Sequence, residues 1–186
     1  MEKASISEIQ AKLQENWPEA LTPACRVVLG AYRLSEIVEA KTNPVLAAHG
    51  LTDAGFETLV ALRAEKGRQM TPSELWRAVL ITSGGMTKLL KQFEEVGYVI
   101  RADNPEDKRS RFVQLTEKGA AHIEATMAAV ADNDRDIFEG VMSDAQLNDL
   151  ADALQLALSR MEGGETDSLK ESGPVSFKET GSADRV

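Results

Sequence analysis

The fold of this chain is decided by residues 71–119, TPSELWRAVLITSGGMTKLLKQFEEVGYVIRADNPEDKRSRFVQLTEKG. Their apolar spacing predicts a short helix that starts at Thr71-Pro72 and runs through Val79. Thr82 or Ser83 then caps a second helix, because a hydroxyl side chain can accept a hydrogen bond from the first helical turn. Two helices joined by so short a connection predict a helix-turn-helix unit.

Two strands follow this pair of helices. Residues 98–103 and 111–115 alternate apolar and polar side chains, and the turn-forming segment 104–108 joins them. A charged hairpin directly after a helix-turn-helix forms a wing. We therefore expect a mainly α-helical fold with a small β-hairpin wing, a winged helix-turn-helix that reads double-stranded DNA.

Helical patterns flank this stretch on both sides. The predicted helices cover residues 5–16, 22–49, 53–67, 116–139 and 143–161. Pro44 should kink or break the second of them near Asn43, since proline removes a helical hydrogen bond.

The sequence divides into four regions. We expect dimerisation helices in 1–50, the winged helix-turn-helix in 51–119, further dimerisation helices in 120–162 and a disordered tail in 163–186, where Gly, Ser, Thr, Glu and Lys leave little to bury. The first and last helices are apolar along one face, yet a winged helix needs only the middle of the chain for its core. A second copy is the simplest partner for these faces, and the alternative is that they fold back within a monomer.

Net charge separates the middle of the chain from the rest. The whole chain carries a formal charge of -9, which is unusual for a protein that binds phosphates. Residues 63–118 hold 11 lysines and arginines against 8 acidic residues, whereas the remainder holds 10 against 22. This positive segment within an acidic chain would orient the protein on DNA.

The predicted second helix has two distinct faces. Met86, Leu89, Leu90, Phe93 and Val96 form an apolar stripe. We expect this stripe to pack against Leu75, Trp76 and Val79 of the preceding helix, with Trp76 buried in the core. Small and basic residues on the other face suit entry into a major groove. The predicted DNA contacts of the two helices are Ser73, Thr82, Ser83, Gly84, Thr87, Lys88 and Lys91. The alternative is an ordinary solvated helix face.

The wing gathers positive charge at its turn. Lys108, Arg109 and Arg111 lie at or beside the tip, and Asp107 can hold the guanidinium of Arg109 in a fork. An arginine on a hairpin tip can enter a narrow minor groove, where the negative potential is concentrated. A merely solvated charged turn is the alternative.

These motifs, in this order, resemble the MarR family of regulators. The resemblance rests on the hydroxyl-rich helix start, the apolar stripe, Gly97, the Asp107-Lys108-Arg109 tip and the exit Leu115-Thr116-Glu117-Lys118-Gly119, and it covers about residues 5–161. It implies a homodimer whose first and last helices interlock, palindromic operators, Arg109 in the minor groove and Asp107 as its partner. It also implies release of DNA when a small phenolic or other anionic aromatic compound binds.

Within that family the layout most resembles the urate-responsive, PecS-like branch. Trp17, the His49-Gly50-Leu51 sequence and TSGGMT at 82–87 carry this likeness. The chain departs from the branch at Glu57, where the branch has aspartate, and at Lys91, near where it has arginine. Without that arginine a urate anion lacks its obvious partner, so only the scaffold is carried over.

An aromatic or anionic effector would need aromatic walls and a cation. The candidate ligand residues are Trp17, Tyr32, Arg33, His49 and Glu57, and each taken singly also suits an ordinary core or surface position. Two other functions stay open. Cys25 would serve a thiol-based oxidation sensor or be structural, and the acidic balance would suit a protein-interaction module that has lost DNA binding.

Several classes of protein find no support in the sequence. No apolar run is long enough to cross a membrane, and the polar N-terminus lacks an export signal. The single cysteine fits a reducing cytoplasm. His49 and His122 are too isolated for a metal site, and neither a nucleophile–base pair nor a phosphate loop occurs. We therefore expect no metal, cofactor or enzymatic activity.

Overall fold

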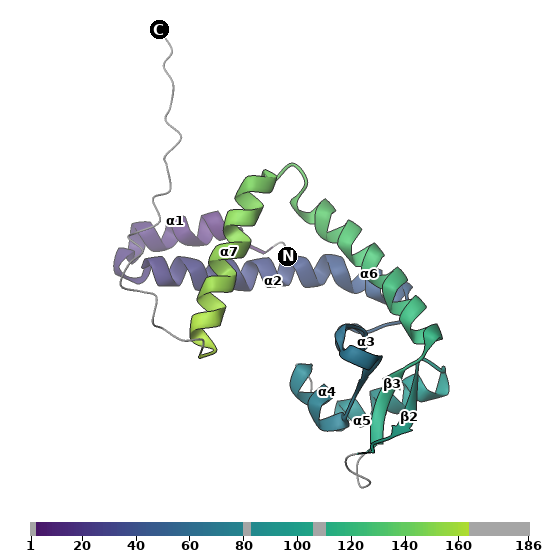
Figure 1. The fold of residues 1–186 in the computed structure, drawn as a ribbon. Helices are drawn as coiled ribbons and strands as arrows, with labels where there is room; N and C mark the ends of the chain where they lie inside the picture. Colours follow the sequence, from purple (N-terminus) through teal and green to yellow (C-terminus); the bar gives the residue numbers. More distant parts are fainter. Residues whose placement is uncertain (1–2, 80–82, 106–110, 164–186) are drawn as a thin grey trace. The chain divides into compact units, whose positions relative to one another are not determined.

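The computed structural model describes residues 3–79, 83–105 and 111–163. Figure 1 shows helices, with a small sheet beside α5 and the start of α6. In chain order the elements are α1 (Ile6–Asn16), η1 (Pro18–Ala20), α2 (Pro23–Ala48), α3 (Asp53–Ala64), η2 (Lys66–Arg68), β1 (Gln69–Met70), α4 (Pro72–Ala78), α5 (Ser83–Glu95), β2 (Val99–Asp103), β3 (Arg111–Leu115), α6 (Glu117–Phe138) and α7 (Asp144–Met161). The expected mainly α-helical fold with a small wing is confirmed.

The chain forms two compact units, residues 1–138 and 139–186. The first holds α1 to α6 and the sheet, and the second holds α7. Of the predicted tail, only Gly163 lies within the described residues. The division into dimerisation and DNA-binding regions stays a prediction.

Three helices begin with reciprocal caps. Ser5 opens α1 with Glu8, Thr71 opens α4 with Glu74, and Ser143 opens α7 with Gln146. In each cap the hydroxyl accepts from the backbone N–H three residues on, and the longer side chain accepts from the backbone N–H of the capping residue. These local bonds fix where the helices start, including the start of α4.

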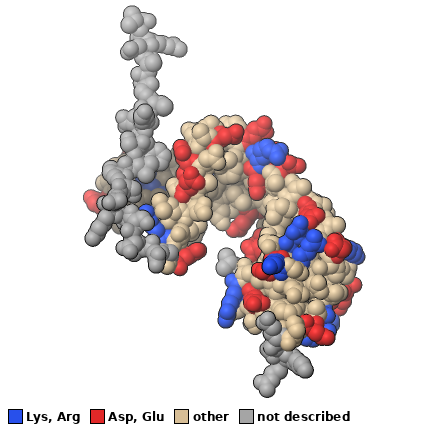
Figure 2. All heavy atoms as spheres, in the orientation of Figure 1, with Lys and Arg blue, Asp and Glu red and all other residues tan. Residues whose placement is uncertain are grey.

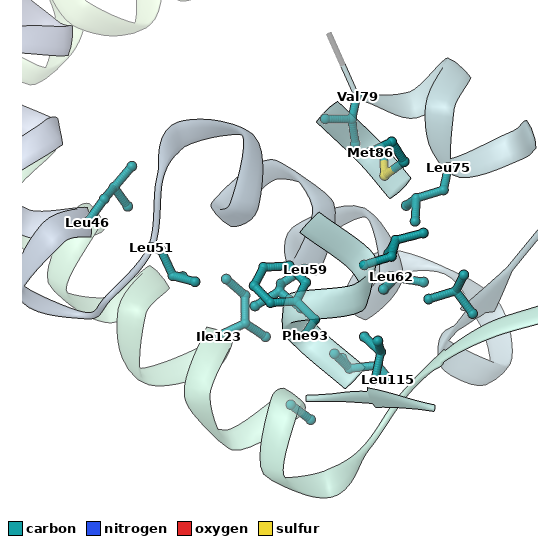
Figure 3. Close-up of a cluster of buried hydrophobic side chains, with 14 of the residues drawn as sticks. Leu46, Leu51, Leu59, Leu62, Leu75, Val79, Met86, Phe93, Leu115 and Ile123 are labelled. Carbon is teal, nitrogen blue, oxygen red and sulfur yellow. The ribbon is translucent and has the colours of Figure 1, made fainter. Parts of the chain in front are cut away.

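One core lies where α3, α4, α5, the sheet and the start of α6 meet. Figure 3 shows its side chains pointing toward one another from these elements, together with Leu46 from the end of α2. Its fully buried members include Leu46, Leu59, Leu62, Leu75, Leu90, Val99, Val113 and Ile123. Each buried leucine stabilises the fold by about 1.5–3 kcal/mol relative to exposure, so this cluster holds the winged region together.

The sheet has three antiparallel strands in the order β1-β3-β2. Val99 pairs with Leu115, Arg101 with Val113, and Asp103 with Arg111. The two predicted strands are therefore found, and β1 is an addition that the sequence analysis missed. A strand of two residues is too short to show an alternating pattern.

The expected break at Pro44 does not occur, because helix α2 continues through Pro44 to Ala48. The expected kink stays a prediction. Leu46, two residues after the proline, is buried, and α2 packs on α6, so tertiary packing outweighs the lost hydrogen bond. Trp76 is 48% exposed instead of buried. Leu75 and Val79, four residues apart, form the buried side of short α4, and Trp76 is rotated about 100° away from Leu75.

Candidate DNA-binding interface

Helix α5 presents two faces of opposite character. Met86, Leu90 and Phe93 are buried in the core. Thr87, Lys88 and Lys91 are exposed, as predicted for the DNA-reading face. The ammonium of Lys91 lies 3.9 Å from the Glu95 carboxylate, an exposed pair that is worth little in water and leaves the lysine available to phosphate.

The apolar stripe of α5 ends earlier than predicted. Val96 is 47% exposed because the helix has ended at Glu95, and Gly97 turns the chain with φ +77°. A positive φ is costly for a residue with a side chain, so glycine suits this turn. The prediction of Val96 as a member of the buried stripe was therefore wrong.

The other predicted DNA contacts are distributed over the winged region. Ser73 is exposed in the first turn of α4, and Ser83 and Gly84 belong to the first turn of α5. Thr82, Asp107, Lys108 and Arg109 lie outside the described residues.

Arg111 lies at the start of β3 with its side chain 59% exposed. Its Nη2 donates to the carbonyl oxygen of Arg101, 3.1 Å away, and its Nε is 3.6 Å from a carboxylate oxygen of Asp103. These contacts join the two strands near the described end of the wing. Arg111 thereby fixes one strand against the other while its exposed surface still faces water.

Residues at the start of α6 form hydrogen bonds with the turn that follows α5. The Thr116 hydroxyl donates to the carbonyl oxygen of Gly97, 2.8 Å away, and accepts from the backbone N–H of Gly119. The Lys118 ammonium donates to the carbonyl oxygen of Val96 at 2.7 Å, where the negative end of the helix dipole favours a cation. These bonds hold the DNA-reading helix at its C-terminal end.

Gly119 allows the start of α6 to lie this close to the turn. A Cβ at that position would lie 2.3 Å from the carbonyl oxygen of Tyr98, too close for any side chain. From the sequence, Leu115 to Gly119 marked the resemblance and the passage from strand to helix, but not the contact with Gly97. The reason for the motif became visible only in three dimensions, because it joins segments about twenty residues apart.

Aromatic rings continue from this turn toward the end of α2. Tyr98 stacks on His122 with ring centroids 4.5 Å apart, and His122 lies 6.2 Å from His49. The Thr126 hydroxyl donates to the carbonyl oxygen of His122 and lies 3.1 Å from Nδ1 of His49. His49 thus has a structural contact within its subunit.

The five candidate ligand residues do not form one constellation. Trp17 and Tyr32 are 63% and 74% exposed. Among the described residues, no hydrogen bond or ion pair joins two of the five, which include partly buried Glu57. Arg33 donates to the carbonyl oxygen of Ala4 at 2.8 Å and pairs with Glu36, so it ties the segment before α1 to α2.

The candidate ligand residues do not line the hollow on the surface of α1 and α2. A hollow between α1 and α2 is lined by Gln10, Pro23, Arg26 and Val27, and none of the five candidates contributes to it. Cys25 is a partly exposed free thiol in the first turn of α2. In the part of the chain that the structure describes, no cluster of three metal-ligating side chains occurs, and no helix is long and apolar enough to span a membrane.

Charge is mixed over the winged region. Figure 2 shows lysine and arginine atoms there, interspersed with acidic ones. Several of the cations already pair within the protein, including Arg63 with Glu124, Arg68 with Glu117 and Arg101 with Glu94. Lys88 and Lys91 are exposed cations on the outer face of α5, and Lys91 makes only the long, exposed contact with Glu95.

A winged helix that presents such a face defines a class of protein, the DNA-binding transcriptional regulators. The model of the MarR family matches residues 49–110. The transcriptional regulator SarZ of Staphylococcus haemolyticus is 32% identical over 128 residues, which cover 69% of this chain and 84% of SarZ. The chain belongs to the MarR family, whose members are transcription regulators, and it is a DNA-binding regulator.

Solved structures share the fold. Sco3205 of Streptomyces coelicolor, a MarR-family regulator solved in complex with DNA, matches with a TM-score of 0.65 and 23% identity over 79% of this chain and 93% of Sco3205. NadR, solved in complex with 4-hydroxyphenylacetate, matches with a TM-score of 0.59 and 21% identity over 75% of this chain and 94% of NadR.

Proposed function

We propose that this protein is a homodimeric, ligand-responsive repressor that binds a palindromic operator with α5 in the major groove and the wing in the minor groove. The observation that carries the proposal is the two-faced α5. Its buried side fixes the helix in the core, and its exposed side offers Thr87, Lys88 and Lys91. Retention of this face in a MarR-family chain favours DNA reading over a DNA-silent interaction module.

The helix contacts have separate roles in this proposal. Lys88 and Lys91 neutralise phosphates or reach guanine, and Thr87 contacts a base edge or a phosphate. The first turn of α5, with Ser83 and Gly84, lies closest to the bases, because short residues let the backbone approach. Thr82, which precedes α5 in the sequence, is assigned to the same contact from its sequence alone. Ser73 contributes a phosphate contact from α4.

The wing supplies the minor-groove contact. Arg109 enters the groove, Asp107 orients its guanidinium, and Lys108 and Arg111 neutralise nearby phosphates. The sequence of the tip and the family relationship support these assignments.

A second copy of the chain completes the protein in this proposal. On α2, the side chains of Val27, Val28, Tyr32 and Ile37 are between 42% and 74% exposed, and Trp17 adds to this apolar surface. Leu154, Leu156, Leu158 and Met161 of α7 are also exposed. Regions 1–50 and 120–162 would form the dimer and 51–119 would read DNA, in the cytoplasm, with recognition helices one DNA turn apart, ~34 Å, or a multiple of that spacing.

The effector in this proposal is a small aromatic or anionic compound, and the lysine at position 91, near where the urate-responsive branch has arginine, disfavours urate. NadR, which shares the fold, was solved with an aromatic carboxylate. Trp17 and Tyr32 would provide aromatic surface, Arg33 positive charge, and His49 and Glu57 hydrogen-bonding groups. Since no hydrogen bond or ion pair joins two of these five described residues, a second subunit would help to enclose the ligand in this proposal.

Fluorescence anisotropy on DNA from upstream of the protein's own gene tests the proposal. At several salt concentrations, we expect saturable binding by two subunits per site, much tighter than to an unrelated duplex of equal length. Arg109→Ala should weaken operator binding by about tenfold, because one minor-groove arginine contributes roughly 1–3 kcal/mol. Operator binding by Arg109→Ala as tight as by the parent would refute the wing assignment.

A further inference from the structure

An ion pair joins the DNA-reading helix to the wing. Glu94 lies in the last turn of α5 and Arg101 in the middle of β2. The Nε of Arg101 donates to a carboxylate oxygen of Glu94 at 2.5 Å. Both side chains are about one-third exposed, at 36% and 30%. This contact connects two elements that touch DNA in the proposed function.

The position of Arg101 in the sheet makes the pair more than a surface contact. Arg101 pairs in register with buried Val113 and lies two residues after buried Val99, so it is on the face of the sheet that packs on the core. Its carbonyl oxygen accepts from Arg111, which lies near Asp103. One chain of contacts therefore runs from α5 through both strands.

Apolar burial along the wing ends part of the way along its strands. Val99 and Leu115 are buried at the base and Val113 is buried opposite Arg101, whereas Asp103 and Arg111 are exposed and Asn104 after them is a buried polar residue. The apolar contacts of the hairpin with the core thus end at the level of Arg101 and Val113. The ion pair lies at this level, where it adds a direct contact between the hairpin and α5.

We propose that Glu94 and Arg101 are positioning residues that set the direction of the wing relative to α5, so that one subunit engages both grooves at once. This inference rests on the proposed reading of DNA by α5 and the wing. Neither side chain needs to touch DNA. The pair acts by lowering the entropy that the wing loses on binding.

Removal of the Glu94 charge separates a positioning role from a purely electrostatic one, because the two predict opposite changes in DNA affinity. Glu94 is a negative charge on a DNA-reading helix, so its removal should tighten binding to phosphates if charge alone matters. The same holds if Arg101 is a phosphate contact that Glu94 withholds. A positioning role predicts weaker binding on removal of Glu94. The sign of the change therefore separates the two accounts.

The experiment measures binding of the full-length protein to a duplex that the parent selects from a random pool. Glu94→Gln and Arg101→Gln should each weaken binding by roughly twofold to fivefold, as expected for a partly exposed pair. The double substitution should be no worse than either single one, because both remove the same interaction. The dependence of affinity on salt should stay that of the parent, since no phosphate contact is lost.

The chain offers a matched control. Glu124→Gln breaks the pair of Arg63 and Glu124, which also joins Nε to a carboxylate oxygen, at 2.7 Å, between α3 and α6. It removes the same charge, and its affinity should equal that of the parent. Glu94→Gln and Glu124→Gln should have the same thermal unfolding midpoint. A loss of affinity in Glu94→Gln alone then reports positioning and not stability.

Arg101→Lys adds a test that preserves charge. It keeps a cation for phosphate but loses the planar guanidinium that holds Glu94, so a positioning role predicts binding weaker than the parent's. The inference is overturned if Glu94→Gln binds as tightly as the parent or more tightly, or if Arg101→Gln reduces the salt slope by about one unit. A parent that selects no duplex would refute both the proposed function and this inference. Selection by the parent with unchanged binding by Glu94→Gln would refute the inference alone.

Discussion

The winged region and the helices that flank it differ in how much of their apolar surface is buried. In the described part of the chain, every buried apolar side chain lies between Leu46 and Val130. Helix α1 buries none, and Leu46, near the end of α2, is the one residue that α2 buries. The winged region thus shares one core with the end of α2 and with α6, whereas large apolar side chains stay exposed on the rest of α2, on α7 and at Trp17 after α1. In the proposed function a second subunit covers this exposed apolar surface.

The core of the winged region should be the most sensitive part of the molecule. Leu59→Ala empties a site with 0% exposure, and we expect it to lower the free energy of unfolding by about 2–5 kcal/mol. Ile100→Ala, at a 51% exposed position of β2, is the control and should change it by less than about 0.5 kcal/mol. Urea denaturation measures both. Equal effects of the two substitutions would remove the distinction between core and surface.

The exposed apolar side chains of α2 should matter for assembly and not for the fold of the winged region. Tyr32→Glu places a charge on a 74% exposed aromatic position, and we expect it to weaken self-association by roughly tenfold or more. Trp76→Glu, at the 48% exposed tryptophan of α4, should leave association unchanged. Sedimentation equilibrium measures both variants. A Tyr32→Glu protein that associates like the parent would place the dimer interface elsewhere.

Two lysine substitutions, one in the winged region and one in α1, test which region contacts the DNA phosphates. Lys88→Ala should reduce the slope of log affinity against log salt by about one unit if the ammonium contacts phosphate. Lys12→Ala removes an exposed lysine from α1 and should leave that slope unchanged. Anisotropy titrations at several salt concentrations measure both slopes. An unchanged slope in Lys88→Ala would place this side chain away from the DNA backbone.

The helix caps give the smallest expected difference, through pH. Hydrogen bonds from the backbone and hydroxyl of Thr71 lower the pKa of the Glu74 carboxyl from its ordinary value of 4.5. A lowered folded-state pKa means that the stabilisation is present above pH 4.5 and is lost as pH falls through the folded-state pKa. The corresponding cap of α7 uses Gln146, which does not titrate.

Amide exchange at pH values from 6 to below about 3 would compare these two caps, the lower limit lying beneath the ordinary carboxyl pKa. Protection of the first turn of α4 should fall with acidification in the parent, and this loss should be smaller in Glu74→Gln. An identical acid response of the parent and Glu74→Gln would show that this carboxylate does not govern the cap.

Local signals in the sequence were sufficient for much of the fold. The wing strands follow from the alternation at 98–103 and 111–115, and the helix starts follow from hydroxyl caps. The exposed face of α5 was also predicted correctly, because a buried stripe fixes the opposite side of a helix.

The remaining features depend on contacts between distant segments. The exposure of Trp76 follows from how α4 lies on the core, and β1 exists only through its pairing with β3. No local sequence pattern predicts the hydrogen bond of Arg33 to Ala4 or that of Thr116 to Gly97. The candidate ligand residues share no constellation within one subunit, so the effector site stays a proposal.

Hydrogen exchange of the full-length protein at two concentrations, above and well below its dissociation constant for self-association, tests the central claim most directly. We predict that amides in α3, α5 and the buried strands keep the same protection at both concentrations, while amides in α1 and the first half of α2 lose protection on dilution. Protection that does not depend on concentration anywhere would contradict the account, because the flanking helices would then be satisfied within one chain. A simultaneous loss in the winged region would contradict it as well, because that region would then lack an independent core.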